Sequence, residues 1–141
     1  KNIKKIFMTD GNDVTIVNNP FKFINNNDIY IGTEEETIKN KLDWFNKKCI
    51  NKELKKSLQK NKFEIILNAG IIGGTRENIL DILGKMNSLF RNYADKNCDI
   101  NMAVLNVVGY DNLKNKKISK KLNSKFKHYQ HYRDDVYFIH K

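Results

Sequence analysis

Two carboxylates stand close together where an apolar segment near the N-terminus ends. The segment reads IFMTDGNDV, and its acids are Asp10 and Asp13. In open α/β sheets, ligands bind beyond the carboxyl ends of the strands, which is where these two side chains would lie. Carboxylates held close repel each other unless a cation joins them, and Mg²⁺ and Mn²⁺ prefer oxygen ligands. The spacing therefore indicates a divalent-cation site, and an ordinary polar turn with solvated acids is the alternative.

A glycine-rich segment, NAGIIGGT over residues 68–75, is a second place where chemistry could occur. Gly70, Gly73 and Gly74 carry no Cβ, so the backbone could take a positive φ there and come close to a ligand. The glycine spacing of a phosphate-binding P-loop is absent. A turn that leads from a strand into a helix would also need at least one of these glycines.

Apolar stretches predict the strands that would position these residues. The stretches are short, rich in Ile, Val and Phe, and bounded by polar turns, which is typical of buried strands. The expected strands cover residues 4–9, 15–17, 28–32, 63–67 and 136–139.

Helical spacing of apolar residues predicts the remaining elements. Thr33 and Glu36 match a capping box at the start of one helix, and Thr75 is expected to cap the longest helix. The expected helices cover residues 33–48, 51–60, 76–93 and 99–107. Because strands alternate with helices, we predict an α/β fold with a mixed sheet and flanking helices, forming a single domain over residues 1–141.

The composition limits the functional classes. A net charge of +10, from 26 basic and 16 acidic residues, suits polyanionic partners, although a lysine-rich solvated surface explains it as well. Cys49 and Cys98 lie far apart and favour free thiols in a reducing compartment such as the cytoplasm. No run of about 20 apolar residues is present, so we expect no membrane span.

A basic and aromatic segment lies near the C-terminus. His128 and His131 stand in FKHYQHY, but no third metal ligand follows at a suitable spacing, so a surface or packing role is expected. Lysines over residues 114–127, together with these aromatic residues, also permit single-stranded nucleic-acid binding. A basic nucleic-acid-binding module is therefore one alternative function.

Four segments in order resemble those of nucleotide-sugar-dependent glycosyltransferases of the GT-A fold, including glycogenin-like members. The first, TDGNDVTIVNNPF, resembles a strand that ends in an aspartate motif and leads to Pro-Phe. The second, NAGIIGGT, and the third, DINMAVLN, resemble the family's N-(A/S)-G strand end and D-Q-x-x-L-N helix start. The fourth, YFIHK, is similar to the late histidine that completes the metal site. From the first to the last, these segments span residues 9–141, which is most of the chain.

The resemblance implies a metal-dependent transferase that moves a sugar from a nucleotide-diphosphate donor to an unknown acceptor, which could be a glycan, a protein or a small molecule. It implies Mn²⁺ or Mg²⁺ as the cofactor, held by Asp10, Asp13 and His140. It also implies donor- and acceptor-binding residues, which are Asn68, Gly73, Gly74 and Lys141. Asp99 is the implied catalytic residue, which would hydrogen-bond sugar hydroxyls or orient the attacking acceptor. It could equally act as a helix N-cap.

The chain departs from the family pattern in three ways. Its acids form D-x-x-D rather than D-x-D, which leaves open whether Asp10 or Asp13 is the main metal ligand. The D-Q pair is replaced by Asp99-Ile100. The family's nucleotide-binding part precedes the aspartate motif, so base and ribose contacts are expected upstream of this chain. An inactive remnant of the fold is therefore a further alternative.

Overall fold

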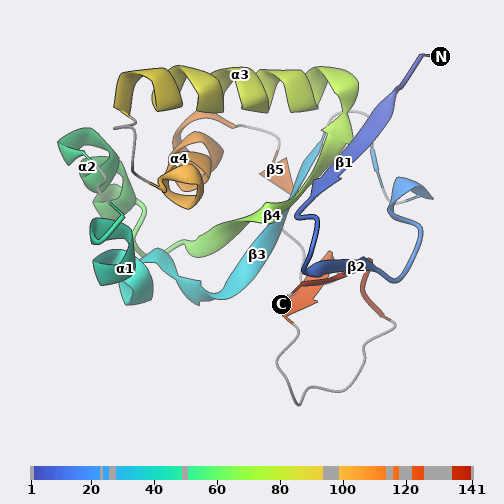
Figure 1. Cartoon of the computed structure of the whole chain (residues 1–141), viewed down its shortest axis with the longest axis horizontal. Helices are drawn as coiled ribbons and strands as arrows, with labels where there is room; N and C mark the ends of the chain where they lie inside the picture. Colours follow the sequence, from blue (N-terminus) through green and yellow to red (C-terminus); the bar gives the residue numbers. More distant parts are fainter. Residues whose placement is uncertain are drawn as a thin grey trace. The chain divides into compact units, whose positions relative to one another are not determined.

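The computed structural model describes residues 2–22, 24–25, 28–48, 51–93, 99–113, 116–117, 122–125 and 135–140. Strands and helices are mixed along the chain (Figure 1). The strands are β1 (Lys5–Thr9), β2 (Val14–Ile16), β3 (Ile29–Thr37), β4 (Ile65–Thr75), β5 (Lys116–Lys117), β6 (Asn123–Lys125) and β7 (Phe138–His140). The helices are η1 (Pro20–Lys22), η2 (Ile38–Lys41), α1 (Leu42–Asn46), α2 (Lys52–Lys60), α3 (Arg76–Tyr93), α4 (Asn101–Val107) and the π-helical turn η3 (Val108–Asn112). Within these ranges, no helix combines the length and the apolar character that crossing a membrane requires.

The strands form two sheets, and each is mixed. The first has the order β1-β4-β3-β5, with β1 antiparallel to β4 and β5 parallel to β3. The second has the order β2-β7-β6, with β2 antiparallel and β6 parallel to β7. The prediction of a mixed α/β fold with flanking helices is thus confirmed, whereas the GT-A type remains a prediction.

The contacts within the chain divide it into two compact units. Unit 1 comprises Lys1–Thr33, Asn68–Leu80 and Asn115–Lys141, and unit 2 comprises Glu34–Leu67 and Asp81–Lys114. The chain passes from one unit to the other inside β3, inside β4 and inside α3. Whether residues 1–141 act as a single domain stays a prediction.

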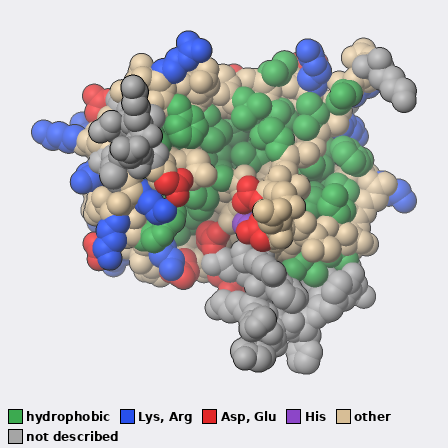
Figure 2. All heavy atoms as spheres, in the orientation of Figure 1, with side chains coloured by type: hydrophobic (Ala, Val, Ile, Leu, Met, Phe, Trp, Pro, Cys, Tyr) green, Lys and Arg blue, Asp and Glu red, His purple; other side chains and the backbone are tan. Residues whose placement is uncertain are grey.

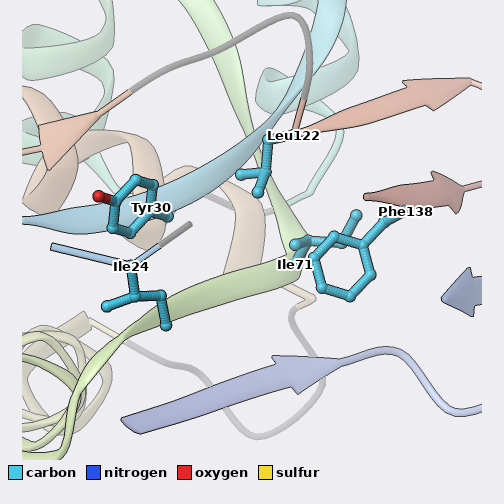
Figure 3. Close-up of a cluster of buried hydrophobic side chains, with 5 residues drawn as sticks. All are labelled: Ile24, Tyr30, Ile71, Leu122 and Phe138. Carbon is cyan, nitrogen blue, oxygen red and sulfur yellow. The ribbon is translucent and has the colours of Figure 1, made fainter. Parts of the chain in front are cut away.

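Unit 1 is built around an apolar cluster from four separate stretches of the chain. Figure 3 shows its five buried side chains, which are Ile24, Tyr30, Ile71, Leu122 and Phe138. Phe7 of β1 packs on the same cluster, with its ring centroid 5.1 Å from that of Phe138. This packing joins β1, which Asp10 follows, β4, and β7, which ends at His140.

Unit 2 is held together by buried apolar side chains and one buried amide. Leu54 and Leu58 form the apolar face of α2, and the Asn51 side chain caps that helix by accepting a hydrogen bond from the Leu54 amide at 2.9 Å. The buried Asn106 of α4 accepts from the Leu67 amide and donates to the Leu67 carbonyl, both at 2.9 Å. Asn106 therefore pairs with β4 as a neighbouring strand would.

The expected helix start at Thr33 is wrong, because residues 33–37 continue β3. Thr33 lies within β3, and the residues before and after it in the sequence also belong to that strand. Glu36 forms an ion pair with Lys41 at 3.3 Å instead of closing a capping box. The place of β3 between β4 and β5 in the sheet outweighs the local helix signal of this segment. The helical conformation begins at Ile38, so the predicted apolar residues Ile38 and Phe45 are still buried.

Two other boundaries differ from the sequence prediction. The strand expected at 63–67 continues through the glycines to Thr75, so NAGIIGGT is strand rather than turn. Thr75 nevertheless caps α3 as predicted, because its Oγ1 accepts from the Asn78 amide at 3.3 Å. The N-cap of α4 is Ile100. Asp99 is therefore not the N-cap.

Candidate metal centre

Asp10, Asp13 and His140 converge in unit 1, as the sequence predicted. One ligand atom from each lies within 4.8 Å of the others. The Nε2 atom of His140 is 3.5 Å from Asp13 Oδ2 and 3.8 Å from Asp10 Oδ2. The histidine is buried, whereas both aspartates are open to solvent. Figure 2 shows a histidine side chain (purple) bordered by acidic side chains (red), and His140 is the one histidine within the described ranges.

Strand pairing brings these three residues together. The last residue of β1 is opposite Ile71, and the amide of Asp10 continues the ladder by donating to the Gly70 carbonyl at 3.0 Å. Val14 at the start of β2 is opposite His140, which places the preceding Asp13 beside the imidazole. The short turn between β1 and β2 then carries both aspartates to the end of β7.

Gly70 forms the base of this centre. A Cβ at this position would lie 2.7 Å from His140 Cε1, 2.8 Å from Asp10 Oδ2 and 2.9 Å from Asn68 Oδ1. These separations are shorter than any that a real Cβ tolerates. The side chains therefore occupy the space that a larger residue would need, and only glycine allows them to approach the strand so closely.

Asn68 belongs to the same centre. Its side chain is 5% exposed, and its Oδ1 accepts a hydrogen bond from the Gly70 amide at 2.6 Å. Asn68 Oδ1, Asp10 Oδ2 and His140 Cε1 all face the one point that the absent Gly70 Cβ would fill. The predicted donor-binding amide is thus next to the predicted metal ligands.

The spacing of His140 from each of the two aspartates fits one divalent ion. Mg²⁺ and similar ions bind oxygen and nitrogen at about 2.0–2.2 Å, so two ligand atoms on one ion are at most about 4.4 Å apart. The His140–Asp13 and His140–Asp10 separations of 3.5 and 3.8 Å lie below this limit. Two carboxylates with one imidazole form a donor set for Mn²⁺ or Mg²⁺ that leaves positions for water or phosphate oxygens.

Gly73 and Gly74 are also in unit 1, but other groups fill the space beside them. A Cβ on Gly73 would lie 2.0 Å from the Phe7 ring, and one on Gly74 would lie 3.2 Å from the Asp28 carbonyl oxygen. None of Gly70, Gly73 and Gly74 has a left-handed backbone, in contrast to the expected positive φ. These two glycines serve close packing on β1 and β3, and their contact with a donor sugar stays a prediction.

Asp99 belongs to unit 2, where its carboxylate pairs with Lys48. The Lys48 Nζ to Asp99 Oδ2 distance is 2.8 Å, and the Asp99 side chain is exposed. Its predicted catalytic role remains untested. Lys141, His128 and His131 lie outside the described residues, as does most of the basic segment 114–127.

Sequence reasoning missed the structural role of Gly70. It predicted that Gly70 lets the backbone come close to a ligand, whereas the residue makes room for the centre's own side chains. The signal for this role was the position of Gly70, two residues after Asn68, in a strand antiparallel to β1, which ends just before Asp10. That signal becomes readable only once the strand register is known.

Comparisons of the chain with protein-family models, with curated proteins and with solved structures found no match.

Proposed function

We propose that Asp10, Asp13 and His140 bind Mn²⁺ or Mg²⁺, and that the protein is a glycosyltransferase using a nucleotide-diphosphate sugar as donor. The observation that carries the proposal is the convergence of three ligand atoms within 4.8 Å over a glycine. Bound there, the ion would supply a positive charge that stabilises the diphosphate leaving group. The ordered resemblance of four segments to GT-A glycosyltransferases supports the choice of this reaction.

The chain's own residues would divide the work of binding and positioning. Asp10 and Asp13 supply negative charge at the solvent-exposed side, and the buried His140 supplies a neutral nitrogen ligand from beneath. Asn68, whose side chain accepts from the Gly70 amide, would hydrogen-bond a group bound beside the ion. Asp99 is proposed to bind a sugar or acceptor hydroxyl.

Metal-dependent binding of a sugar nucleotide is the first measurement to make. We expect Mn²⁺ to raise the thermal-unfolding midpoint of the full chain, and a UDP-, GDP- or CMP-sugar to raise it further only when Mn²⁺ is present. A ligand that binds only the native state at 100 times its Kd stabilises that state by about 2.7 kcal/mol. Asp13→Asn should remove most of the Mn²⁺ response, because it replaces a charged ligand with a neutral amide.

Glu77→Gln is the matched control. Glu77 is an exposed acid of unit 1 at the start of α3, so the substitution removes one charge away from the centre. It should leave the Mn²⁺ response intact. An Mn²⁺ response that is the same in Asp13→Asn and in Glu77→Gln would refute the metal centre. An Mn²⁺ response without any sugar-nucleotide response would keep the metal centre and would count against a donor site formed by residues 1–141 alone.

A further inference from the structure

An exposed indole, an ammonium and a carboxylate meet in unit 2. Trp44 of α1 is the only tryptophan in the sequence, and it is 40% exposed. Lys48 Nζ lies 5.1 Å from the centroid of the Trp44 ring and 2.8 Å from Asp99 Oδ2. Asp99, just before α4, thus forms an ion pair with the Lys48 ammonium that lies over the indole. None of these contacts involves the candidate metal centre.

Fold stability gains only modestly from this arrangement. An exposed ion pair contributes about 0–1 kcal/mol and an exposed cation–π contact about 0.5–1 kcal/mol, and a large exposed aromatic side chain leaves apolar surface in water. Phe45, which is buried, packs edge-on against Trp44 with 5.1 Å between ring centroids and 75° between the ring planes. The indole is therefore held by its contact with the buried Phe45 ring, while part of its surface stays exposed to solvent.

We propose that Trp44, Lys48 and Asp99 form a saccharide-binding site. A sugar ring presents C–H groups on its faces and hydroxyl groups around its rim. Where the Lys48 ammonium does not cover it, the exposed part of the indole attracts C–H groups because its π-system carries partial negative charge. The Asp99 carboxylate can accept hydrogen bonds from two neighbouring hydroxyls, and Lys48 can donate to a third oxygen. The three side chains thus match the two kinds of surface that a sugar offers.

The charges favour a neutral saccharide over a nucleic acid. Asp99 neutralises Lys48, and its exposed carboxylate would repel a phosphate backbone. The exposed Phe63 of the same unit differs, because Lys39 and Lys62 lie 5.8 and 5.1 Å from its ring centroid. Phe63 thus provides an aromatic control in a more basic setting.

The inference goes beyond the proposed function, because Trp44, Lys48 and Asp99 lie in unit 2 and the candidate metal centre lies in unit 1. Saccharide binding itself requires neither the metal nor the donor. Failure of the saccharide measurement and failure of the Mn²⁺ measurement can therefore be told apart.

The single tryptophan makes the test direct, because all indole emission comes from the proposed site. The full chain would be titrated with glucose, galactose, N-acetylglucosamine, maltose and lactose while the emission of Trp44 is recorded. We expect a saturable change with at least one of these sugars, and the same change in the presence of EDTA. Asp99→Asn should weaken the affinity about tenfold or more, the loss expected when hydrogen bonds to a charged group are removed.

Asp81→Asn is the matched control for the carboxylate. Asp81 pairs with Lys85 at 2.6 Å on the surface of the same unit, without an aromatic ring. This variant should keep the affinity of the wild type, as should Phe63→Ser for the aromatic control. Absence of a saturable response to every sugar of the panel would overturn the proposal. So would equal affinity in Asp99→Asn, or a stronger response to oligo-dT than to any sugar.

Discussion

At the scale of single residues, two glycines near the candidate centre have opposite requirements. Gly70 lies under Asp10, Asn68 and His140, all within 3 Å of where its Cβ would be. Gly11 lies in the turn between the two aspartates, yet a Cβ there would meet nothing within 4 Å, and its backbone is not left-handed. The centre therefore depends on glycine in the strand rather than in the turn.

Alanine at each position tests this difference. Gly70→Ala should lower the free energy of unfolding by about 1–3 kcal/mol, because the new methyl group overpacks the centre. It should also weaken the stabilisation by Mn²⁺, since the ligands must move apart. Gly11→Ala should leave the Mn²⁺ response unchanged and alter stability by no more than a gain of about 0.4–1 kcal/mol. Urea denaturation with and without Mn²⁺ measures both effects, and equal behaviour of the two variants would contradict this account.

The predictable part of the centre was set by strand ends. Asp10 follows β1, Asp13 precedes β2 and His140 is the last residue of β7, so the sequence could indicate that they gather at one edge. The contribution of Gly70 could not be predicted, because it depends on the pairing of Asp10 with the backbone of β4. The meeting of Trp44, Lys48 and Asp99 was likewise hidden, since Lys48 and Asp99 are 51 positions apart.

At the scale of elements, the same limit explains why TEEET was assigned to a helix. The capping-box pattern of Thr33 and Glu36 is a local signal, whereas the extended conformation of β3 comes from strands distant in the sequence. The helices α2 and α3 were predicted well because their signals are local. Asn51 caps one and Thr75 caps the other, each through its own side chain.

A second element-scale feature is the attachment of η3 to α2. Asp111 of η3 accepts hydrogen bonds from Ser57, from Lys60 Nζ at 2.9 Å and from Asn61 Nδ2 at 3.0 Å. Burial raises the pKa of the Asp111 carboxyl, but these hydrogen bonds outweigh burial and hold its pKa below the usual value. The ionised form is thus favoured by folding, so its contribution is present above the unfolded pKa of about 3.9 and is lost as the pH falls through the folded value.

Asp111→Asn should therefore destabilise the protein in a pH-dependent way. At pH about 7 we expect the free energy of unfolding to fall by about 1 kcal/mol, a modest value because the carboxylate is partly open to solvent and screened. The difference from wild type should shrink as the pH is lowered below about 4, where the carboxyl of the unfolded chain becomes protonated, and should vanish once the pH has fallen through the lower pKa of the folded state. Urea denaturation across this pH range measures it. A difference that grows towards acidic pH would contradict the assignment.

At the scale of the whole molecule, the chain builds two compact units from interleaved segments. Three of the passages between them lie inside continuous elements, namely β3, β4 and α3. Neither unit can therefore unfold without leaving the ends of these elements unpaired. Because exposed backbone groups at such ends are costly, we expect the two units to unfold together.

Mn²⁺ and the single tryptophan test this expectation, since the ion is proposed to bind in unit 1 and Trp44 reports on unit 2. A ligand that binds only the native state raises the stability of everything that unfolds with its site. If the units unfold as one, Mn²⁺ should raise the midpoint of the Trp44 emission transition as much as that of the circular-dichroism transition. The Asp13→Asn variant should show neither increase. A Trp44 midpoint that does not move while another probe of the wild type responds to Mn²⁺ would mean that unit 2 unfolds independently. The strands that run through both units would then connect them covalently, but Mn²⁺ binding in unit 1 would not stabilise the saccharide site in unit 2.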